Sequence, residues 1–368
     1  MQQTAGGIRV SEPLFPAASS FSTEATPSVR PKYQRYEFKF HGSTSEYFGI
    51  WLSNILLTVL TLTLTLYSPW AKSRRQRYFY GNTEFLQRRF DFTGLPSKIF
   101  LGRLLALEIY IVFLVMSNYS VLLTTLGLGM LYMAVPWLFR LTLKFRSRNT
   151  KFGNTRFYFY GENKYLYRLL SVEVIKTLLS LFILLPRLIW LYKHYCFDHL
   201  QLGQFKFRLN ATHKNYMSAV YRPLLLMLAF SFAMVAMIDA SQSSNSEHDL
   251  LIVILLLLWV IGLIFILPIM LARIYITTWN NLFLGENFFK TRANPWRYAW
   301  IVLSNWVLKI ISLGLLSAWA DIRFYQYKTS MLELFVLDDP NELQNMLQPD
   351  PNSLAAEFSS MFDFDASL

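Results

Sequence analysis

Long apolar runs, separated by short basic and aromatic stretches, dominate the chain. Seven of them lie at about residues 47–70, 97–117, 120–140, 166–191, 217–239, 250–275 and 298–319. A helix rises about 1.5 Å per residue, so each run is long enough to span the roughly 30 Å hydrocarbon core of a bilayer. Helices satisfy their own backbone in lipid, and no series of ten-residue alternating strands is present. The pattern predicts an all-α integral membrane protein, a polytopic bundle of about seven apolar helices.

Composition and charge agree with a membrane protein. Hydrophobic residues make up 54% of the chain and charged residues only 16%, with a formal net charge of +12. Lys and Arg flank the apolar runs instead of gathering on one polar domain, which favours anionic lipid headgroups over nucleic acid as the partner. A single cysteine, Cys196, excludes an internal disulfide. The N-terminus lacks a basic start followed by an apolar region, so no cleavable signal peptide is expected.

The two ends of the chain have the composition of polar tails. Residues 1–35 are rich in Ser, Thr, Ala and Pro, which predicts a disordered N-terminal tail. Residues 331–368 carry eight acidic side chains and neither Lys nor Arg. They predict an acidic, soluble C-terminal tail that could bind a protein partner.

An internal repeat organises the apolar runs. A Phe-x-Phe-x-Gly motif precedes the first run and a related motif precedes the fourth, 119 residues later. A Ser-x-Trp-Ala-x-x-Arg motif ends the first run and ends the seventh. The repeat predicts two full copies of three runs, residues 36–155 and 156–279, and a truncated copy, residues 280–330. The motif residues are Phe38, Phe40, Gly42, Phe157, Phe159, Gly161, Pro69, Trp70, Ala71, Arg74, Trp319, Ala320 and Arg323.

Similar Phe-x-Phe pieces recur at Phe90-Asp-Phe92 and Phe205-Lys-Phe207. Alternating aromatic and polar residues are typical of short extended segments. We expect such segments to lie at the membrane interface.

The sequence resembles the YjgN-like family, bacterial inner-membrane proteins of unknown function. The resemblance rests on the Phe-x-Phe-x-Gly motif, on the stretch from Ile50 to Thr58, on Pro69-Trp70-Ala71-Lys72 with Arg74 and Arg77-Tyr78, and on Asn82-Thr83. It covers about residues 36–330. It implies a helical protein of the bacterial inner membrane, and it supplies no activity, substrate or catalytic residue.

The basic connections leave two topologies open. The connections at about residues 117–120 and 241–249 contain no Lys or Arg, which places them on the non-cytoplasmic side, whereas the other connections are basic. If all seven runs cross, two basic connections must face outward and successive repeats are inverted. If the first, fourth and seventh runs enter and return on one side, every basic connection is cytoplasmic and four runs cross.

Polar residues at matched positions of the first, fourth and seventh runs are the candidate site. A carboxylate deep in an apolar run costs about 2.5 to 3.5 kcal/mol on insertion, so Glu173 needs a partner or water. Lys176 shares its helical face, and Asn54 and Asn305 occupy the matched positions. One interpretation is a polar centre where the repeats meet, with Lys309 paired to Glu173; the others are a local ion pair and hydrogen bonding between helices. The remaining candidate residues are Thr58 and Thr177.

Enzymatic chemistry has little support in the sequence. The five histidines lie in connections, none belongs to a His-Glu-x-x-His motif, and no nucleotide-binding loop is present. We expect no catalytic residue, metal or cofactor; a lipid-modifying enzyme is a distant third reading. The first hypothesis is transport or conduction of a small solute or lipid through the polar centre. The alternative is a membrane scaffold that docks a protease or envelope partner through the acidic tail.

Overall fold

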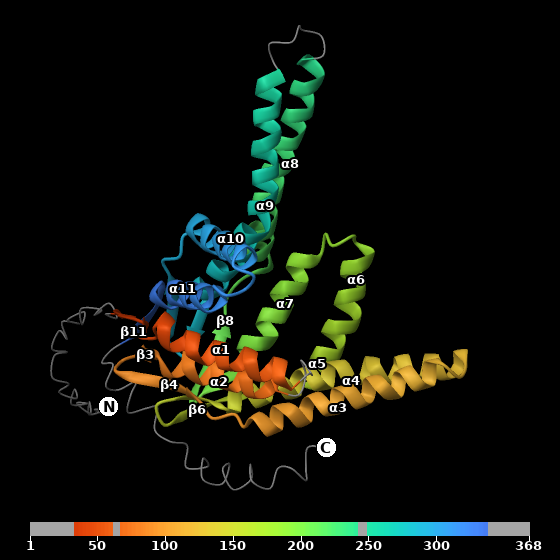
Figure 1. Ribbon diagram of the computed structural model, residues 1–368, viewed down its shortest axis with the longest axis vertical. Coiled ribbons are helices and arrows are strands. Elements are labelled where there is room, and N and C mark those ends of the chain that lie inside the picture. Colours follow the sequence, from red (N-terminus) through yellow and green to blue (C-terminus); the bar gives the residue numbers. More distant parts are fainter. Residues whose placement is uncertain (1–32, 62–66, 242–248, 338–368) are drawn as a thin grey trace, which may run out of the picture. The chain divides into compact units, whose positions relative to one another are not determined.

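Five strand–helix–helix–strand units build the part of the chain that the structure describes (Figure 1). The computed structural model describes residues 33–61, 67–241 and 249–337, so most of both predicted tails lies outside this part. In each unit one strand leads into a pair of helices, and a second strand returns antiparallel beside the first. The strands therefore form a common base for five helical hairpins.

The units differ mainly in the length of their helices. Unit 1 comprises β1 (Tyr33–Glu37), β2 (Lys39–Phe40), α1 (Thr44–Leu60), α2 (Ser68–Gly81) and β3 (Thr83–Phe85). Unit 2 comprises β4 (Arg88–Phe92), α3 (Pro96–Ser117), α4 (Val121–Arg148) and β5 (Thr150–Phe152). Unit 3 comprises β6 (Thr155–Phe159), α5 (Asn163–Arg168), the π-helical turn η1 (Leu169–Glu173), α6 (Val174–Leu179), α7 (Leu185–Asp198) and β7 (Leu200–Leu202). Unit 4 comprises β8 (Phe205–Leu209), α8 (His213–Ser241), α9 (Asp249–Asn280) and β9 (Leu282–Leu284). Unit 5 comprises β10 (Asn287–Thr291), α10 (Pro295–Ile311), α11 (Ser317–Ser330) and β11 (Leu332–Leu337).

One backbone hydrogen bond recurs in all five units at the point where the helices leave the sheet. The amide just after the first strand donates to the carbonyl just before the returning strand, at 2.9 Å in every unit. The donor and acceptor pairs are His41 and Asn82, Thr93 and Asn149, Tyr160 and His199, Asn210 and Asn281, and Arg292 and Met331. This bond closes the base of each hairpin and shows that the units are structurally equivalent.

Two-residue turns connect consecutive units at the opposite ends of the strands. Three of these turns have glycine at the first central position with positive φ, namely Gly153, Gly203 and Gly285 at +56°, +55° and +61°. Such backbone angles suit the twist of a β-hairpin, and glycine adopts them without steric strain. The first turn places Leu86 and Gln87 at +47° and +59° instead.

The strands form one nearly closed antiparallel ring of 11 strands. The two strands at the ends of the sheet order, β1 and β2, are separated in sequence by Phe38 alone. Because β1 pairs with β11 and β2 pairs with β3, the first unit closes the ring against the last. Almost no strand edge is left unpaired, which protects the sheet from edge-to-edge aggregation.

Phenylalanine fills the inside of this ring. One Phe at the first strand of each unit belongs to the main core cluster or packs against it: Phe38, Phe90, Phe157, Phe207 and Phe289. Four neighbouring pairs of these rings stack at centroid distances of 6.1 to 6.4 Å. Together with buried aliphatic residues of the same strands they form the main core cluster. The interior of the ring is therefore a packed core, as in small β-barrels, and offers no open channel.

The prediction of an all-α bundle is wrong, since the sheet has 11 strands. The strands contain two to six residues each, and most paired strands are separated in sequence by a whole helical hairpin. Such short elements produce no local alternating pattern long enough to be recognised. The predicted extended Phe-x-Phe pieces lie at the first strands of their units, which pair with returning strands in one sheet and not with one another.

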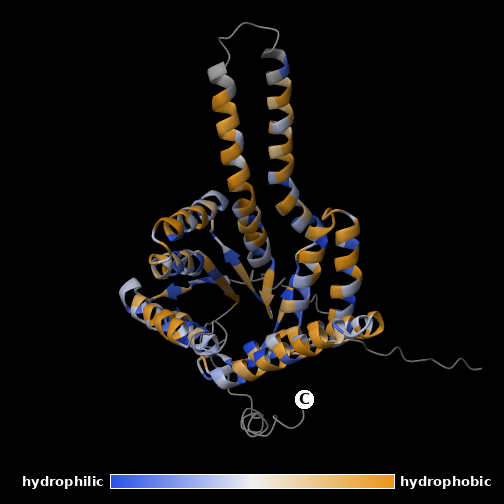
Figure 2. Cartoon of the chain, turned by 45° about the vertical axis from the view of Figure 1, so that its right-hand side comes forward, coloured by the Kyte–Doolittle hydropathy of each residue, from blue (hydrophilic) through white to orange (hydrophobic). Residues whose placement is uncertain are grey.

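The prediction of about seven membrane helices is also wrong. Among the described residues, four helices are long and apolar enough to cross a membrane: α3, α4, α8 over His213–Met237, and α9 over Val253–Asn280. Figure 2 shows in orange the hydrophobic residues that predominate along these helices. The first, fourth and seventh runs are each broken into two shorter helices, and both ends of each run join the same sheet. This arrangement is the one that the four-crossing alternative requires.

A repeat of three apolar runs corresponds to two successive units. The predicted boundary at residues 155–156 lies at the start of β6, whereas the one at residues 279–280 lies at the end of α9, inside unit 4. The strands β1 and β11 show that residues 33–35 and 332–337, which we assigned to the tails, belong to the sheet.

Candidate functional site

The matched polar residues of the three short hairpins lie inside their own hairpins. Asn54 of α1 is buried, and its side-chain oxygen accepts a hydrogen bond from the Tyr67 hydroxyl at 3.4 Å. The Thr58 hydroxyl donates to the backbone carbonyl of Asn54 at 2.6 Å. These contacts connect α1 with the residue that precedes α2.

Glu173 has the same role in unit 3. Its carboxylate is buried and forms ion pairs with Lys176, 3.1 Å away, and with Arg187 of α7, 3.2 Å away. The Thr177 hydroxyl donates to the Glu173 carbonyl at 2.7 Å. The ion pair with Arg187 joins the two arms of the hairpin, and the local pairing that we weighed for Lys176 is present.

Asn305 fills the corresponding place in unit 5. Its side-chain amide donates to the Ala320 carbonyl of α11 at 2.9 Å, and its oxygen accepts from Arg323 at 3.3 Å. Lys309 pairs with Asp321 of α11 at 2.9 Å, so its partner is not Glu173. Among the described residues, no hydrogen bond or ion pair links Glu173 to the matched asparagines. The contacts give three separate interhelical ties.

The Trp-Ala motif begins the second helix of the hairpins in units 1 and 5. Pro69, Trp70, Ala71 and Arg74 lie in the first two turns of α2. In α11 the Arg323 guanidinium lies 5.0 Å from the centre of the Trp319 ring and donates to Ser304 of α10. Ala320 is buried, which leaves room for α10 to pack closely. The motif thus positions helices within a hairpin.

The Phe-x-Gly part of the strand motif has a steric cause. At Gly42, Gly94 and Gly161 an added Cβ would lie 2.4 to 2.5 Å from the ring of the Phe two residues earlier. Units 4 and 5 have Leu209 and Thr291 in place of that Phe, and there the later residue is alanine, Ala211 and Ala293. A large ring therefore accompanies glycine, and a smaller side chain accompanies alanine.

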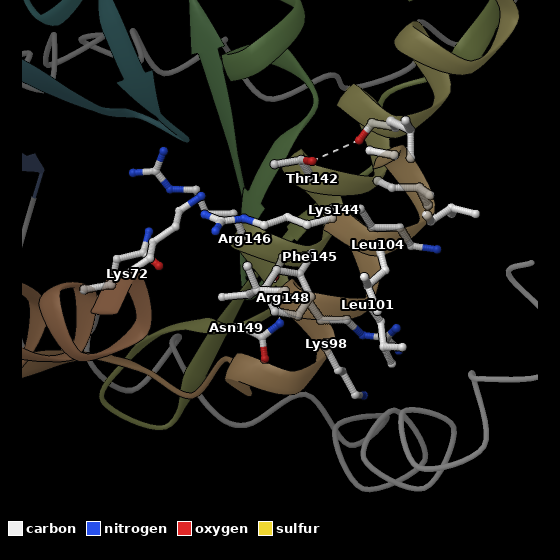
Figure 3. Close-up of a pocket in the computed structure, with 18 of the residues that line it drawn as sticks. Lys72, Lys98, Leu101, Leu104, Thr142, Lys144, Phe145, Arg146, Arg148 and Asn149 are labelled. Atoms are coloured by element: carbon white, nitrogen blue, oxygen red, sulfur yellow. Dashed lines mark hydrogen bonds between the residues drawn. The ribbon is translucent and has the colours of Figure 1, made fainter. Parts of the chain in front are cut away.

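A cavity of about 830 Å³ lies between α2, α3 and α4 (Figure 3). Its lining combines many cations with leucines, and Glu108 is the one carboxylate among the described residues that line it. The lining cations are Lys72, Lys98, Arg103, Lys144, Arg146, Arg148 and Arg156. The lining leucines are Leu101, Leu104, Leu105, Leu138 and Leu141. Neither α2 nor the α3–α4 pair forms this cavity alone.

Four of the cations lie at the sheet end of the cavity. Lys98 is in the first turn of α3, where the helix leaves the sheet; Arg146 and Arg148 are in the last turn of α4, where the helix returns, and Arg156 is in β6. Along α4 the leucines lie farther from the sheet than these cations, whereas on α3 Arg103 lies between Leu101 and Leu104. Both α3 and α4 are long and apolar enough to cross a membrane.

The positive charge of the cavity is concentrated. Burial, followed by the charges of Arg103 and Arg146, lowers the pKa of Lys72. Arg103 donates to the Ser68 hydroxyl, and Arg146 donates to the Tyr80 hydroxyl at 3.1 Å. Both partners are neutral, so these contacts orient the guanidinium groups without cancelling their charge. The arrangement suits an anion.

Sequence reasoning did not find this cavity. It treated the Lys and Arg residues that flank the apolar runs as charges of the connections. The sequence signal for this cavity was the presence of cations at both ends of the α3–α4 hairpin. That signal does not include Lys72, which belongs to unit 1, whereas the α3–α4 hairpin belongs to unit 2. That proximity depends on the pairing of distant strands.

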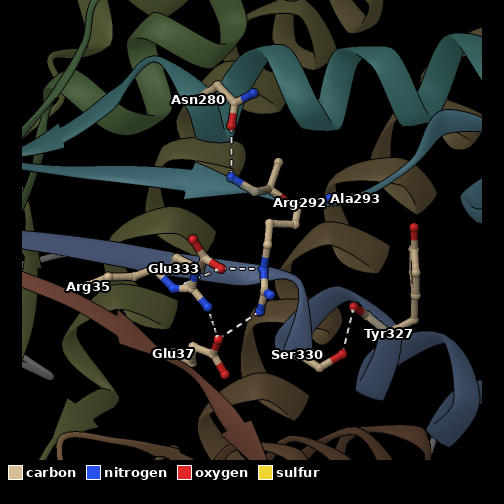
Figure 4. A network of polar contacts seen from close by, with 9 residues as sticks. Arg35, Glu37, Asn280, Arg292, Ala293, Tyr327, Ser330 and Glu333 are labelled. Carbon is tan, nitrogen blue, oxygen red and sulfur yellow. Dashed lines mark hydrogen bonds and ion pairs between the residues drawn. The ribbon is translucent and has the colours of Figure 1, made fainter.

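A second polar cluster closes the ring between units 1 and 5 (Figure 4). Glu333 of β11 is 3% exposed and forms ion pairs with Arg35 of β1 and with Arg292, which follows β10. Glu37 of β1 pairs with both arginines as well, at 2.8 Å from Arg292. All four side chains of the cluster are paired with one another and hold β1 against β11, so the role of the cluster is structural.

Comparisons with known proteins agree with the family resemblance. Residues 35–361 match the family described as "Bacterial protein of unknown function (DUF898)". The chain belongs to this family. The chain is 36% identical to the inner membrane protein YjgN of Escherichia coli K12 over 75 residues, which is 20% of this chain and 18% of that protein. It is 31% identical to the YjgN protein of Salmonella typhimurium over 123 residues, 33% of this chain and 30% of that protein.

The matches to these curated relatives span less than a third of their length. No solved structure matches the chain. The YjgN-like resemblance is confirmed, and the family has no assigned activity.

Proposed function

We propose that this protein is an inner-membrane protein that binds an anionic lipid in the cavity between α2, α3 and α4 and moves it between the bilayer and the protein. The observation that carries the proposal is the lining, in which seven cations, four of them at the sheet end, adjoin five leucines of α3 and α4. The names of the relatives and the four apolar helices support the location.

The size and chemistry of the cavity fit such a ligand. Ligand sites generally have volumes of about 300 to 1,000 Å³, and this cavity has about 830 Å³. Arginine binds phosphate oxygens in a bidentate manner, and Arg103, Arg146 and Arg148 are all in the lining. A headgroup anion would also offset the mutual repulsion of Lys72, Arg103 and Arg146.

Two other routes have less support in the geometry. Transport through a polar centre between repeats requires Asn54, Glu173 and Asn305 to share one site, but each is occupied in its own hairpin. Passage along the ring axis is blocked by the phenylalanine core. Scaffolding through the acidic tail depends on residues 338–368, which lie outside the described residues, and it stays a prediction.

Lipid binding is tested with the purified full chain. Binding of fluorescent phosphatidylglycerol is compared with that of phosphatidylcholine for the wild type and for the double variant Lys72→Gln, Arg103→Gln. Each cation near an anionic lipid contributes about 1 kcal/mol, so the double variant should bind phosphatidylglycerol about 10- to 30-fold more weakly. Arg89→Gln on the exposed face of β4 removes a charge outside the cavity and should leave binding unchanged.

Equal binding of the two lipids by the wild type, or unchanged binding by the double variant, contradicts the proposal. Movement is measured separately in vesicles, as the rate at which labelled lipid changes leaflet. Binding with no acceleration of that rate removes transport and leaves a lipid-binding protein.

A further inference from the structure

The tips of two short hairpins have the same backbone architecture. In unit 3 the tip is residues 180–185, between α6 and α7, and in unit 5 it is residues 312–317, between α10 and α11. The amides of both tips find equivalent acceptors, position by position. Within unit 3 the acceptors of the six amides are, in order, the carbonyls of Lys176, Leu178, Thr177 and Ser180, the hydroxyl of Ser180, and the carbonyl of Phe182. Within unit 5 they are the carbonyls of Leu308, Ile310, Lys309 and Ser312, the hydroxyl of Ser312, and the carbonyl of Gly314.

This pattern leaves no unpaired amide at either bend. The serine hydroxyls of Ser180 and Ser312 supply the one acceptor that the backbone does not, each at 3.1 Å from the amide four residues later. Non-helical backbone is tolerated at membrane depth only where its polar groups are satisfied, because lipid offers no hydrogen bonds. The amides of both tips meet that condition with acceptors of their own hairpins.

The side chains around the tips are large, apolar and exposed. The exposed fraction is 83% for Leu181 and 94% for Leu313. Their neighbours Leu179, Ile183, Ile310 and Ile311 are also exposed. Such patches are costly in water and mark a contact with lipid or protein.

Charged pairs limit how deep the tips can lie. The ion pair of Lys309 and Asp321 lies one turn below Leu313, and that of Glu173 and Lys176 lies just below Leu179. Four residues of helix separate Lys309 from Leu313, which is about 6 Å. This length matches the depth of about 5 to 10 Å at which amphipathic elements enter the boundary between headgroups and acyl chains.

A neighbouring long helix gives an independent depth marker. The Tyr221 hydroxyl of α8 donates to the carbonyl of Ile183 in the unit 3 tip. Tyr221 lies near the sheet end of the apolar span His213–Met237. About 24 Å of helix lies beyond Tyr221 within that span, so the tip reaches only its first part.

We propose that the tips of units 3 and 5 insert shallowly into the leaflet on the sheet side of the membrane and do not cross it. The partner is the lipid itself, and the flanking ion pairs lie among its headgroups. The inference is independent of the lipid cavity, since it involves different units. Both hairpins then anchor the sheet ring against the membrane surface between the crossing helices.

The test places single cysteines in the full chain, reconstituted in vesicles of phosphatidylglycerol and phosphatidylethanolamine. The background is Cys196→Ala, since a partly buried cysteine behaves as a small apolar residue. Leu181→Cys and Leu313→Cys report on the tips. Gln204→Cys, in the exposed turn after β7, reports on the sheet side, and Val121→Cys reports on the far end of α3 and α4.

We expect the tip cysteines to lose reactivity with a membrane-impermeant maleimide from both sides, while Gln204→Cys reacts from one side and Val121→Cys from the other. A fluorophore on either tip should be quenched by lipids brominated near the headgroup more than by lipids brominated near the chain ends. Reaction of the tips from the Gln204 side shows that they are in water, and reaction from the Val121 side shows that they cross. Disulfide-linked dimers through Leu313→Cys show that a second copy covers the tip. Each of these three outcomes overturns the proposal.

Discussion

The pairing of a large ring with glycine in the strand motif gives the sharpest stability test. In Gly94→Ala the new Cβ would lie 2.4 Å from Cζ and 2.6 Å from Cε1 of Phe92. Carbon atoms prefer separations of about 3.5 to 4.0 Å, so the ring would have to retreat by more than about 1 Å. Phe92 is 1% exposed and contacts Tyr80 at a centroid distance of 6.1 Å, which leaves it little room.

The backbone at Gly94 is also held in place. Its carbonyl accepts hydrogen bonds from the Ser73 hydroxyl at 3.0 Å and from Arg77 at 3.3 Å. Overpacking of a fixed site costs about 1 to 3 kcal/mol, and we expect that loss of unfolding free energy for Gly94→Ala. Phe92→Leu alone should cost about 1 to 2 kcal/mol through lost packing.

The double variant Phe92→Leu, Gly94→Ala recreates the combination that unit 4 already has at Leu209 and Ala211. Its loss should be close to that of Phe92→Leu alone, so the two changes should couple favourably by about 1 to 3 kcal/mol. The assay is reversible unfolding of the purified protein in mixed micelles. Gly81→Ala, where an added Cβ meets no atom within 4 Å, is the control. Strictly additive losses, or a Gly94→Ala variant as stable as the control, would refute the steric explanation.

Three further predictions concern single polar groups. Ser312→Ala removes the acceptor of the Leu316 amide and should lower the unfolding free energy by about 1 to 3 kcal/mol in lipid. The control Ser171→Ala removes only a hydroxyl that donates to the Tyr167 carbonyl of α5 and should lower it less. The same unfolding assay compares the two variants, and equal losses of unfolding free energy would contradict the role of the serine acceptor in the tip. Glu333→Gln leaves Arg35 and Arg292 without their buried carboxylate partner and should lower the unfolding free energy by about 1 to 3 kcal/mol. This is less than for a fully buried pair, because both arginines are half-exposed and solvent screens them. The control Glu84→Gln breaks a surface pair with His41 and should lower the unfolding free energy by less than about 1 kcal/mol. Burial disfavours the charged ring of His194, but hydrogen bonds to Asp198 and to the Ala211 carbonyl, with the Asp198 charge, raise its pKa overall. The protonated ring therefore stabilises the fold fully below the unfolded-state pKa of His194, and this stabilisation is lost as the pH rises through the higher folded-state pKa. Between about pH 5.5 and 8 the unfolding midpoint should fall with rising pH for the wild type and change less for His194→Gln. Parallel pH profiles of the two proteins would contradict this prediction.

The apolar runs could be predicted from sequence because their signal is local. Length and high mean hydropathy identify α3 or α9 without any knowledge of the rest of the chain. The breaks inside the fourth and seventh runs were harder to predict, since Leu181, Phe182 and Leu313 adopt positive φ although they are apolar residues that normally continue a helix. The Ser180 and Ser312 acceptors mark both bends, and Gly314 with φ of +90° marks the second, but an isolated serine or glycine in an apolar run is a weak signal.

The sheet could not be predicted because its information is distributed. β2 has two residues and pairs with β3, more than 40 positions later, and β1 pairs with the last strand of the described chain. The sequence does contain the five related strand motifs, and it predicts extended structure at four of them. It does not show that these motifs belong together, because units 4 and 5 have Leu209 and Thr291 in place of the second Phe and alanine in place of the glycine.

The candidate site is subject to the same limit. The matched polar residues make their contacts within three separate hairpins, because equivalence in a ring places residues at corresponding points of separate units and not at one centre. The lipid cavity arises instead where α2 of one unit meets the α3–α4 hairpin of the next, so its composition is specific to that junction.

The five units of the ring have hairpins of two lengths, which suggests that long and short hairpins have different roles. Units 2 and 4 have the four helices that are long enough to cross a membrane, whereas units 1, 3 and 5 have short hairpins. Long and short units therefore alternate around the ring, except where unit 5 meets unit 1. At that junction two short hairpins are neighbours, α1 contacts α11, and Arg75 of α2 pairs with Asp321 at 3.0 Å. The Arg35, Glu37, Arg292 and Glu333 cluster lies at the same junction, so charged side chains hold the ring closed where no crossing helix separates its neighbours.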